Sequence, residues 1–262
     1  MEALSFLIYP FLGCMLLILI HAYFGIHILE RGVIFLDLSL AQFIALGIAC
    51  SFFFGHESTG HYVFAVIFAV IGASILSFSR QISRSVNIEA FIGVLYVFSL
   101  AGSILVLDRT PHGLEEFKTI MNGNILWLTS KDILEAFVLY TVIGVFQFIF
   151  RKKFFGLSYG TEYRFVWEFL FFLSFAFVLV SSVQIAGILQ VFSFLVIPAL
   201  IGRLYTKEPS KILLAGWAIG FLASVFGVFF SYQLDIPTAP LIVVSLSVVF
   251  FVTLALKSRR AR

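Results

Sequence analysis

Three polar side chains that could contact a charged solute lie within one long apolar segment, residues 33–54. They are Asp37, Ser39 and Gln42. A carboxylate inside a membrane segment costs on the order of 3 kcal/mol on insertion scales, so it usually faces other helices or a water-filled path. Lipid cannot satisfy such groups. The pattern predicts that this segment lines a route through a membrane-embedded bundle, with Asp37 as the candidate metal ligand.

Asp37 also allows a second interpretation, because it lies only about four residues inside the segment. Its carboxylate would then reach water or pair with Arg31. Gln42 is deeper, and it shares one side of a helix with Ser39 because the two are three positions apart. Gln190, in a later apolar segment, is also deep enough to face a cavity. We therefore expect Asp37, Ser39, Gln42 and Gln190 to line the route.

Sequence motifs for enzymatic chemistry are absent from the chain. There is no GxxxxGK(S/T) loop, so we do not expect this chain to hydrolyse ATP itself, and there is no HExxH or GxSxG. His21 and His27 are six positions apart on different sides of a helix, which favours hydrogen-bonded structural roles. Cys14 and Cys50 lie in apolar segments as small buried hydrophobes. We expect a transport subunit without a tightly bound cofactor.

The composition is that of a polytopic membrane protein. Of 262 residues, 61% are hydrophobic and 12% are charged, and the mean hydropathy is +1.08, whereas soluble chains carry about 25% charged residues. The longest mostly polar stretch, about residues 108–124, is too short for a soluble catalytic domain. We therefore expect one integral-membrane domain over residues 1–262, in contact with lipid and not with nucleic acid. The N-terminus does not resemble a removable signal peptide.

Nine apolar segments predict an all-α bundle of about nine transmembrane helices. The sixth and seventh are separated only near Ser181–Gln184, with no charge between them. That region would be either a tight hairpin or one longer broken element, so eight helices are also possible. The nine segments cover approximately residues 4–28, 33–54, 62–79, 88–107, 132–150, 166–183, 185–202, 212–231 and 240–256.

Basic residues predict how the bundle is oriented in the cell membrane. Of the 17 Lys and Arg residues, 14 follow the odd-numbered segments and 3 follow the even-numbered ones. Cytoplasmic loops are enriched in Lys and Arg. The N-terminus is therefore expected outside and the C-terminus in the cytoplasm. If the sixth and seventh segments formed one span, every later loop would change sides and the basic ones would lie outside. The charge pattern therefore favours nine spans.

Two loops and one proline stand out. The outside loop 108–131 ends in MNGNILWLTSKD, which is expected either to lie at the interface or to fold back into the bundle. In the cytoplasmic loop 151–165, a basic start is followed by Gly156–Tyr163, a stretch long enough for a short helix that touches a cytoplasmic partner. Pro198 interrupts a helical hydrogen bond, so it is either a structural kink or a hinge.

Rows of small residues at four-residue spacing predict close packing between helices. They are Ala69, Ala73 and Ser77; Ser99 and Ser103; Gly216, Gly220 and Ser224; and Ala223 and Gly227.

Several stretches resemble the integral-membrane permeases of ABC importers for zinc, manganese or iron. ILERGVIFLDLSLAQFIALG is similar to the second-span signature of that family, and NIEAFIGVLYVFSLAGSIL to its fourth span. NGNILWLTSKDIL resembles its outside segment, SSVQIAGILQVFSFLVIPALIGRL its best-marked helix, and DIPTAPLIVV the start of its last span. The similarity runs in order over most of the chain.

The resemblance implies a type II ABC importer-like permease that moves a divalent metal ion with energy from a separate subunit. It implies a homodimer in which two copies form one translocation path. It also implies two cytoplasmic ATPase subunits and an extracytoplasmic solute-binding protein. The ATPase would dock on the loop around Gly156–Glu168, whose candidate contact residues are Gly156, Ser158, Tyr159, Glu162 and Tyr163.

The chain departs from the family pattern at the predicted route. The family typically has an Asp and a His four residues apart in the second span. Alignment on Gly47 places Gln42 at the His position and Leu38 at the Asp position, and Asp37 is one residue early. An amide is a poorer zinc ligand than an imidazole. A permease of the same fold for a chelated or non-metal substrate is therefore an alternative, and the docking loop is shorter and lacks the usual Asp-Pro.

Overall fold

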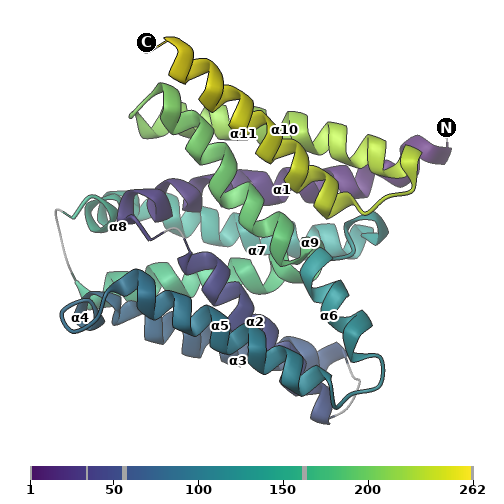
Figure 1. The fold of residues 1–262 in the computed structure, drawn as a ribbon, viewed down its shortest axis with the longest axis horizontal. Helices are drawn as coiled ribbons and strands as arrows, with labels where there is room; N and C mark the ends of the chain where they lie inside the picture. Colours follow the sequence, from purple (N-terminus) through teal and green to yellow (C-terminus); the bar gives the residue numbers. More distant parts are fainter. Residues whose placement is uncertain (1, 34, 55–57, 161–163, 261–262) are drawn as a thin grey trace.

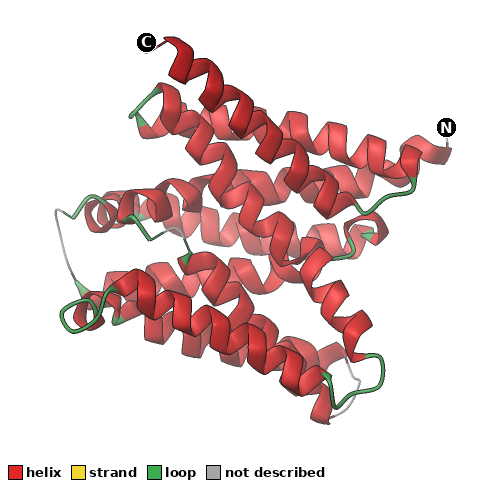
Figure 2. Cartoon of the chain, viewed as in Figure 1, coloured by secondary structure: helices red, strands yellow, loops and turns green. Residues whose placement is uncertain are grey.

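The computed structural model describes residues 2–33, 35–54, 58–160 and 164–260. In that part of the chain the regular structure is helical, with no strand (Figures 1 and 2). The elements are α1 (Glu2–Arg31), α2 (Leu36–Ser51), η1 (Phe52–Phe54), α3 (Ser58–Ser77), α4 (Ser79–Ile82), α5 (Ile88–Leu107), α6 (Gly113–Asn122), η2 (Ile125–Trp127), α7 (Ser130–Ile149), α8 (Arg151–Ser158), α9 (Phe165–Tyr205), α10 (Pro209–Leu234) and α11 (Thr238–Arg260).

Local sequence signals set several helix starts. Thr129 and Asp132 form a capping box at α7, in which the Asp132 Oδ2 atom accepts a hydrogen bond from the Thr129 N–H at 2.8 Å. The Asn87 Oδ1 atom caps α5 by accepting from the Ala90 N–H at 3.1 Å. Pro209 opens α10, where its missing N–H costs nothing.

Helices α1, α2 and α9 form the centre of the bundle. Their most apolar windows are 72% to 78% buried, whereas those of α3, α5, α7, α10 and α11 are 17% to 39% buried. In the described part of the chain these are the eight helices long and apolar enough to cross a membrane. The peripheral helices present apolar side chains outward, as lipid or a partner in the membrane requires.

The 41-residue helix α9 doubles back on itself. Glu168, near its start, pairs with Arg31 at 2.6 Å, and Arg203, near its end, pairs with Glu30 at 3.1 Å. A straight helix would separate Glu168 and Arg203 by about 52 Å at 1.5 Å per residue. Because Glu30 and Arg31 are neighbours at the end of α1, both ends of α9 lie at one end of the bundle, as Figure 1 shows.

The reversal lies at Gly187, with φ 72° and ψ 167°. These angles fall in a region that essentially only glycine occupies. The arms 165–186 and 188–205 each have a length within the roughly 17–25 residues with which a helix crosses a bilayer. When the two arms of α9 are counted separately, the eight apolar helices of the described residues make nine membrane-length segments, which agrees with the prediction of about nine.

The predicted break near Ser181–Gln184 was wrong by a few residues. Ser182 does not break the helix, because its hydroxyl donates a hydrogen bond to the Val178 carbonyl at 2.7 Å within α9. A serine can be satisfied inside a helix in this way, whereas the reversal needs the backbone freedom of Gly187.

The segment after α6 folds back into the bundle, which decides between the two arrangements expected for loop 108–131. Gly123, with φ 66° and ψ −173°, lies against the backbone of Ala186 and Gly187. The Asn124 N–H donates to the Ile185 carbonyl at 3.2 Å. Two backbones approach this closely because neither Gly123 nor Gly187 carries a Cβ atom.

The two termini lie at opposite ends of the bundle (Figure 1). Near the N-terminus the Phe6 ring contacts the Trp127 ring, with 6.0 Å between centroids, at the end that holds Gly187. Near the C-terminus Lys257 donates to the Leu204 carbonyl, at the end that holds Arg31. We call these the Gly187 end and the Arg31 end.

The rows of small residues are packing surfaces, as predicted. Ala69, Ala73 and Ser77 of α3 are fully buried. On α10, a Cβ atom at Gly220 would overlap Ile18 of α1, and one at Gly227 would overlap Ile242 of α11. These contacts let the helices approach closely.

Substituting Gly187 tests the reversal. Gly187→Ala places a Cβ in a backbone region that costs about 1–3 kcal/mol for other residues, and the new atom overlaps Gly123. We expect a clear loss of thermal stability of the purified protein in detergent. Gly144→Ala is the matched control, because a Cβ there meets no atom within 4 Å, and it should leave the midpoint nearly unchanged. Equal midpoints for the two variants would contradict the assigned geometry.

Candidate functional site

The three candidate route residues of α2 are all buried inside a single chain. Asp37 is 1% exposed, and Ser39 and Gln42 are fully buried. The Asp37 Oδ1, Ser39 Oγ and Gln42 Oε1 atoms have no hydrogen-bond partner among the described residues. Unpaired buried polar atoms are rare, because each costs about 1–3 kcal/mol. Three on one 16-residue helix mark α2 as a candidate solute-contacting element.

The alternative pairing of Asp37 with Arg31 is not what the structure has. The Arg31 Nη1 atom donates to the Glu168 Oε1 atom at 2.6 Å, whereas the Asp37 Oδ1 atom stays unpaired inside the bundle. The reversal of α9 explains this, because it brings Glu168 beside the end of α1. Glu168 was not predicted as the partner of Arg31, because the two residues are 137 positions apart in the sequence.

Gln42 is covered from the Gly187 end by α6. Its Nε2 atom donates a hydrogen bond to the Met121 sulfur at 3.4 Å. Met121 lies in the last turn of α6, just before Gly123. Sulfur is a weak acceptor, so this contact leaves the amide weakly held and its Oε1 atom unpaired. In this conformation α6 therefore closes the bundle above Gln42.

Gln190, the fourth candidate, lies on the second arm of α9 and faces α1. Its Nε2 atom donates to the Cys14 sulfur at 3.4 Å, and its Oε1 atom is also unpaired. No hydrogen bond joins Gln190 to Gln42. The structure thus has two buried amides with unpaired carbonyl oxygens on different helices. Gln190 lies on α9, three residues after the reversal, and Gln42 lies on α2, next to α6.

The described residues contain no group of three or more His, Cys, Asp and Glu side chains placed to hold a metal ion. Asp37 is the charged residue of α2, and the other polar residues near it on that helix, Ser39 and Gln42, are neutral. Hydroxyl, amide and carboxylate oxygens suit harder ions such as manganese better than zinc. Such a set can guide a cation along a path more readily than retain it.

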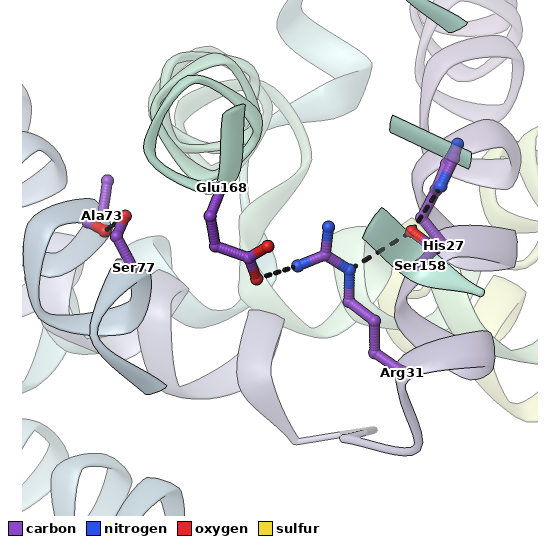
Figure 3. A network of polar contacts seen from close by, with 6 residues as sticks. All are labelled: His27, Arg31, Ala73, Ser77, Ser158 and Glu168. Atoms are coloured by element: carbon purple, nitrogen blue, oxygen red, sulfur yellow. Dashed lines mark hydrogen bonds and ion pairs between the residues drawn. The ribbon is translucent and has the colours of Figure 1, made fainter. Parts of the chain in front are cut away.

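A second polar cluster, not predicted from the sequence, lies at the Arg31 end (Figure 3). The Ser158 hydroxyl of α8 accepts from the Arg31 Nε atom at 3.3 Å and lies 2.8 Å from the His27 Nδ1 atom. Glu168 completes the cluster through Arg31. His27 has the structural role predicted for it, held by a hydrogen bond and fully buried. Basic and acidic residues at neighbouring helix ends were the available sequence signal.

A cavity of about 400 Å³ opens beside this cluster. On one side it is bounded by the ends of α1, α8 and α9, and on the other by the first residues of α2 and α5 and by α4 with the turn after it. Its polar lining residues are Glu30, Arg31, Ser79, Ser83, Ser158, Tyr159 and Glu168. Leu36, the residue before Asp37, also lines it.

The candidate docking residues divide into buried and exposed ones. Ser158 is buried and occupied by His27 and Arg31, so it cannot itself touch a partner in this state. Tyr159 is 44% exposed; its partial burial raises the pKa of its phenol, Glu30 adds to that rise and Arg203 opposes it. Gly156 is partly buried in α8. Glu162 and Tyr163 lie outside the described residues.

Pro198, the candidate hinge, lies in a helical part of α9. Within α9 the residue with non-helical angles is Gly187. Pro198 is buried and packs near Gly216 of α10. The large change of direction in α9 therefore belongs to Gly187, and Pro198 stays a predicted hinge.

Similar proteins agree with this architecture. The chain is 25% identical over 236 residues to the manganese transport system membrane protein MntC of Listeria innocua, covering 87% of this chain and 82% of that one. It is 22% identical to the chelated iron transport system membrane protein YfeC of Yersinia pestis, covering 87% and 79%. In structure it is similar to PsaBC from Streptococcus pneumoniae in complex with Fab, with a TM-score of 0.78, 20% identity, and coverage of 95% and 90%.

The fold and the buried polar residues of α2 are thus found in a chain whose residues 3–257 match the ABC 3 transport family. Because that match covers nearly the whole chain, the protein belongs to the ABC 3 transport family and is a membrane permease subunit of an ABC importer.

Proposed function

We propose that this permease carries a divalent metal ion, with manganese as the first candidate, past the polar atoms of α2. The observation that carries the proposal is the set of buried, unpaired oxygens on Asp37, Ser39 and Gln42. MntC, a relative over 87% of the chain, is named as a manganese transport protein. Oxygen donors suit manganese, so the donors available here agree with that name.

The second candidate is a chelated metal. Gln42 stands where the family typically has a histidine, and the described residues hold no cluster of metal-ligating side chains. YfeC, a relative of similar coverage, is named for chelated iron. A chelate brings its own ligands and needs only polar groups for passage, which Gln42 and Gln190 supply.

The described conformation is closed toward the Gly187 end. All four route residues are at most 1% exposed within one chain, so a path between two copies cannot be lined by them unless helices move. We propose that ATP binding by a separate subunit drives this movement. Two copies of the chain, two ATPase subunits docked near α8 and a solute-binding protein at the Gly187 end would form the importer.

Sidedness follows from the same proposal. Arg151 and Lys152 of α8 are exposed at the Arg31 end, as are basic residues near the C-terminus such as Lys257 and Arg259. Positive charge is enriched on the cytoplasmic side. The Arg31 end and the C-terminus would therefore face the cytoplasm, and the N-terminus would face outward in the cell membrane.

Purification from the native host tests the assignment. We expect a stable complex with an ATP-hydrolysing subunit that, in proteoliposomes, takes up Mn²⁺ or an iron chelate only with ATP. Radiolabelled Mn²⁺ and a labelled iron chelate, supplied separately, distinguish the two substrates. ATP-independent uptake by the chain alone, or the absence of any ATPase partner, would show that the proposal is wrong.

Asp37→Asn tests the role of the carboxylate. The substitution keeps the shape and removes the charge, so Mn²⁺ uptake should fall by about tenfold or more, equivalent to about 1.4 kcal/mol. ATPase assembly should be unchanged. Glu135→Gln is the matched control, because Glu135 is an exposed carboxylate of α7. Equal Mn²⁺ uptake by the two variants would show that Asp37 does not line the route. Loss of Mn²⁺ uptake with retained uptake of the iron chelate would favour free Mn²⁺ as the substrate that Asp37 contacts.

Water access tests the route directly. With Cys14 and Cys50 replaced by Ala, a Ser39→Cys variant should react with a small charged thiol reagent at some stage of the ATP cycle. Ser99→Cys on α5 is the control, since Ser99 is equally buried but hydrogen-bonded to Leu95 in a packing row, and it should stay unreactive. If position 39 stays as unreactive as position 99 in every nucleotide state, α2 does not line a path.

A further inference from the structure

Arg31 joins three elements at one buried point. Its guanidinium donates to Glu168 at the start of α9 and to Ser158 at the end of α8. The side chains of Arg31 and Glu168 are 8% and 2% exposed. The guanidinium carbon also lies 4.1 Å from the centre of the Phe171 ring, a cation–π contact that limits its movement. Arg31 is therefore held from several directions at once.

A buried ion pair of this kind is poor evidence for stability alone. The cost of removing two charges from water often equals or exceeds their attraction, so apolar replacements are frequently neutral or stabilising. What the pair supplies is a fixed geometry, because guanidinium hydrogen bonds are directional. At this position, that geometry fixes α8 to the ends of α1 and α9.

A second ion pair extends the same rigid unit. Glu30 pairs with Arg203 at 3.1 Å, and Arg203 also donates to the Leu29 carbonyl at 2.9 Å. The end of α1 is thus tied to both arms of α9. Together with Ser158, these contacts make the Arg31 ends of α1, α8 and α9 one unit.

The opposite wall of the 400 Å³ cavity belongs to other helices. Leu36 of α2, Ser79 of α4 and Ile88 of α5 face the unit across this space. Between α1 and α2, Gly32 has φ +71° and no atom within 4 Å of a Cβ built there. At Gly32 the connection between the unit and α2 is thus not held by side-chain packing against the described residues.

We propose that Arg31, Glu168 and Ser158 are positioning residues that transmit movement of α8 to α1 and α9, and so widen or narrow the cavity at the base of α2. This inference rests on the proposed function, in which an ATPase subunit pushes on α8. Asp37 is the next residue in the chain after Leu36, which lines that wall, so the same movement reaches the first polar group of the route. The three residues need not contact the substrate.

The test is the ratio of transport to ATP hydrolysis in the reconstituted complex. We expect Arg31→Gln and Glu168→Gln to keep ATP hydrolysis but to lower substrate transported per ATP by about fivefold or more, the lower range of coupling between sites. Because the two act as one unit, the double variant should lose no more than either single variant. Lys131→Gln, which breaks the exposed Lys131–Glu135 pair, should leave the ratio unchanged.

Ser158→Ala keeps the Arg31–Glu168 ion pair and removes the α8 hydroxyl that contacts Arg31 and His27, so it decides the matter if the charge variants fail to fold or assemble. It should also lower transport per ATP. An unchanged ratio in Ser158→Ala, or additive losses in the double variant, would overturn the inference. If the unmodified complex shows no ATP-dependent transport, the proposed function has failed instead, and that result is seen before any variant is compared.

Discussion

The structure depends on the backbone contact between Gly123 and Gly187. Both residues adopt angles that side chains exclude, and each fills the space that a Cβ atom on the other would need. The contact lets α9 reverse at the Gly187 end and is sealed by the hydrogen bond from Asn124 to Ile185. The pairing of Glu168 with Arg31 and of Arg203 with Glu30 at the Arg31 end follows from that reversal.

Buried polar side chains between α1, α7 and α9 form hydrogen bonds with one another, whereas polar atoms of α2 lack partners. Gln147 of α7 accepts from Tyr23 at 3.3 Å and donates to Ser174 at 2.8 Å, and Tyr140 and Ser182 lie 2.7 Å apart. These bonds join α1, α7 and α9. In an apolar surrounding, a satisfied polar contact fixes two helices, and an unsatisfied one favours contact with water or a solute. Three of the unsatisfied atoms, on Asp37, Ser39 and Gln42, lie on helix α2.

The same reversal separates the closed and the open parts of the molecule. Above Gln42, α6 and its Met121 close the Gly187 end. Below Asp37, a cavity separates the start of α2 from the charged unit at the ends of α1, α8 and α9. A transporter needs such a difference between its two ends, because a path open at both would dissipate the gradient it builds.

Composition and spacing along the chain were enough to predict the membrane class, about nine apolar segments, the close-packed rows of small residues and the polar residues of α2. Each of these depends on residues that are near one another in the chain. The signals are the length of an apolar segment, small residues at four-residue spacing, and a charged residue within an apolar segment. The folded chain was needed to locate the reversal at Gly187, the fold-back of loop 108–131, the partner of Arg31 and the burial of Ser158. Those depend on which distant segments meet. Glu168 lies 137 positions from Arg31, and local periodicity carries no information about a contact that long-range packing creates.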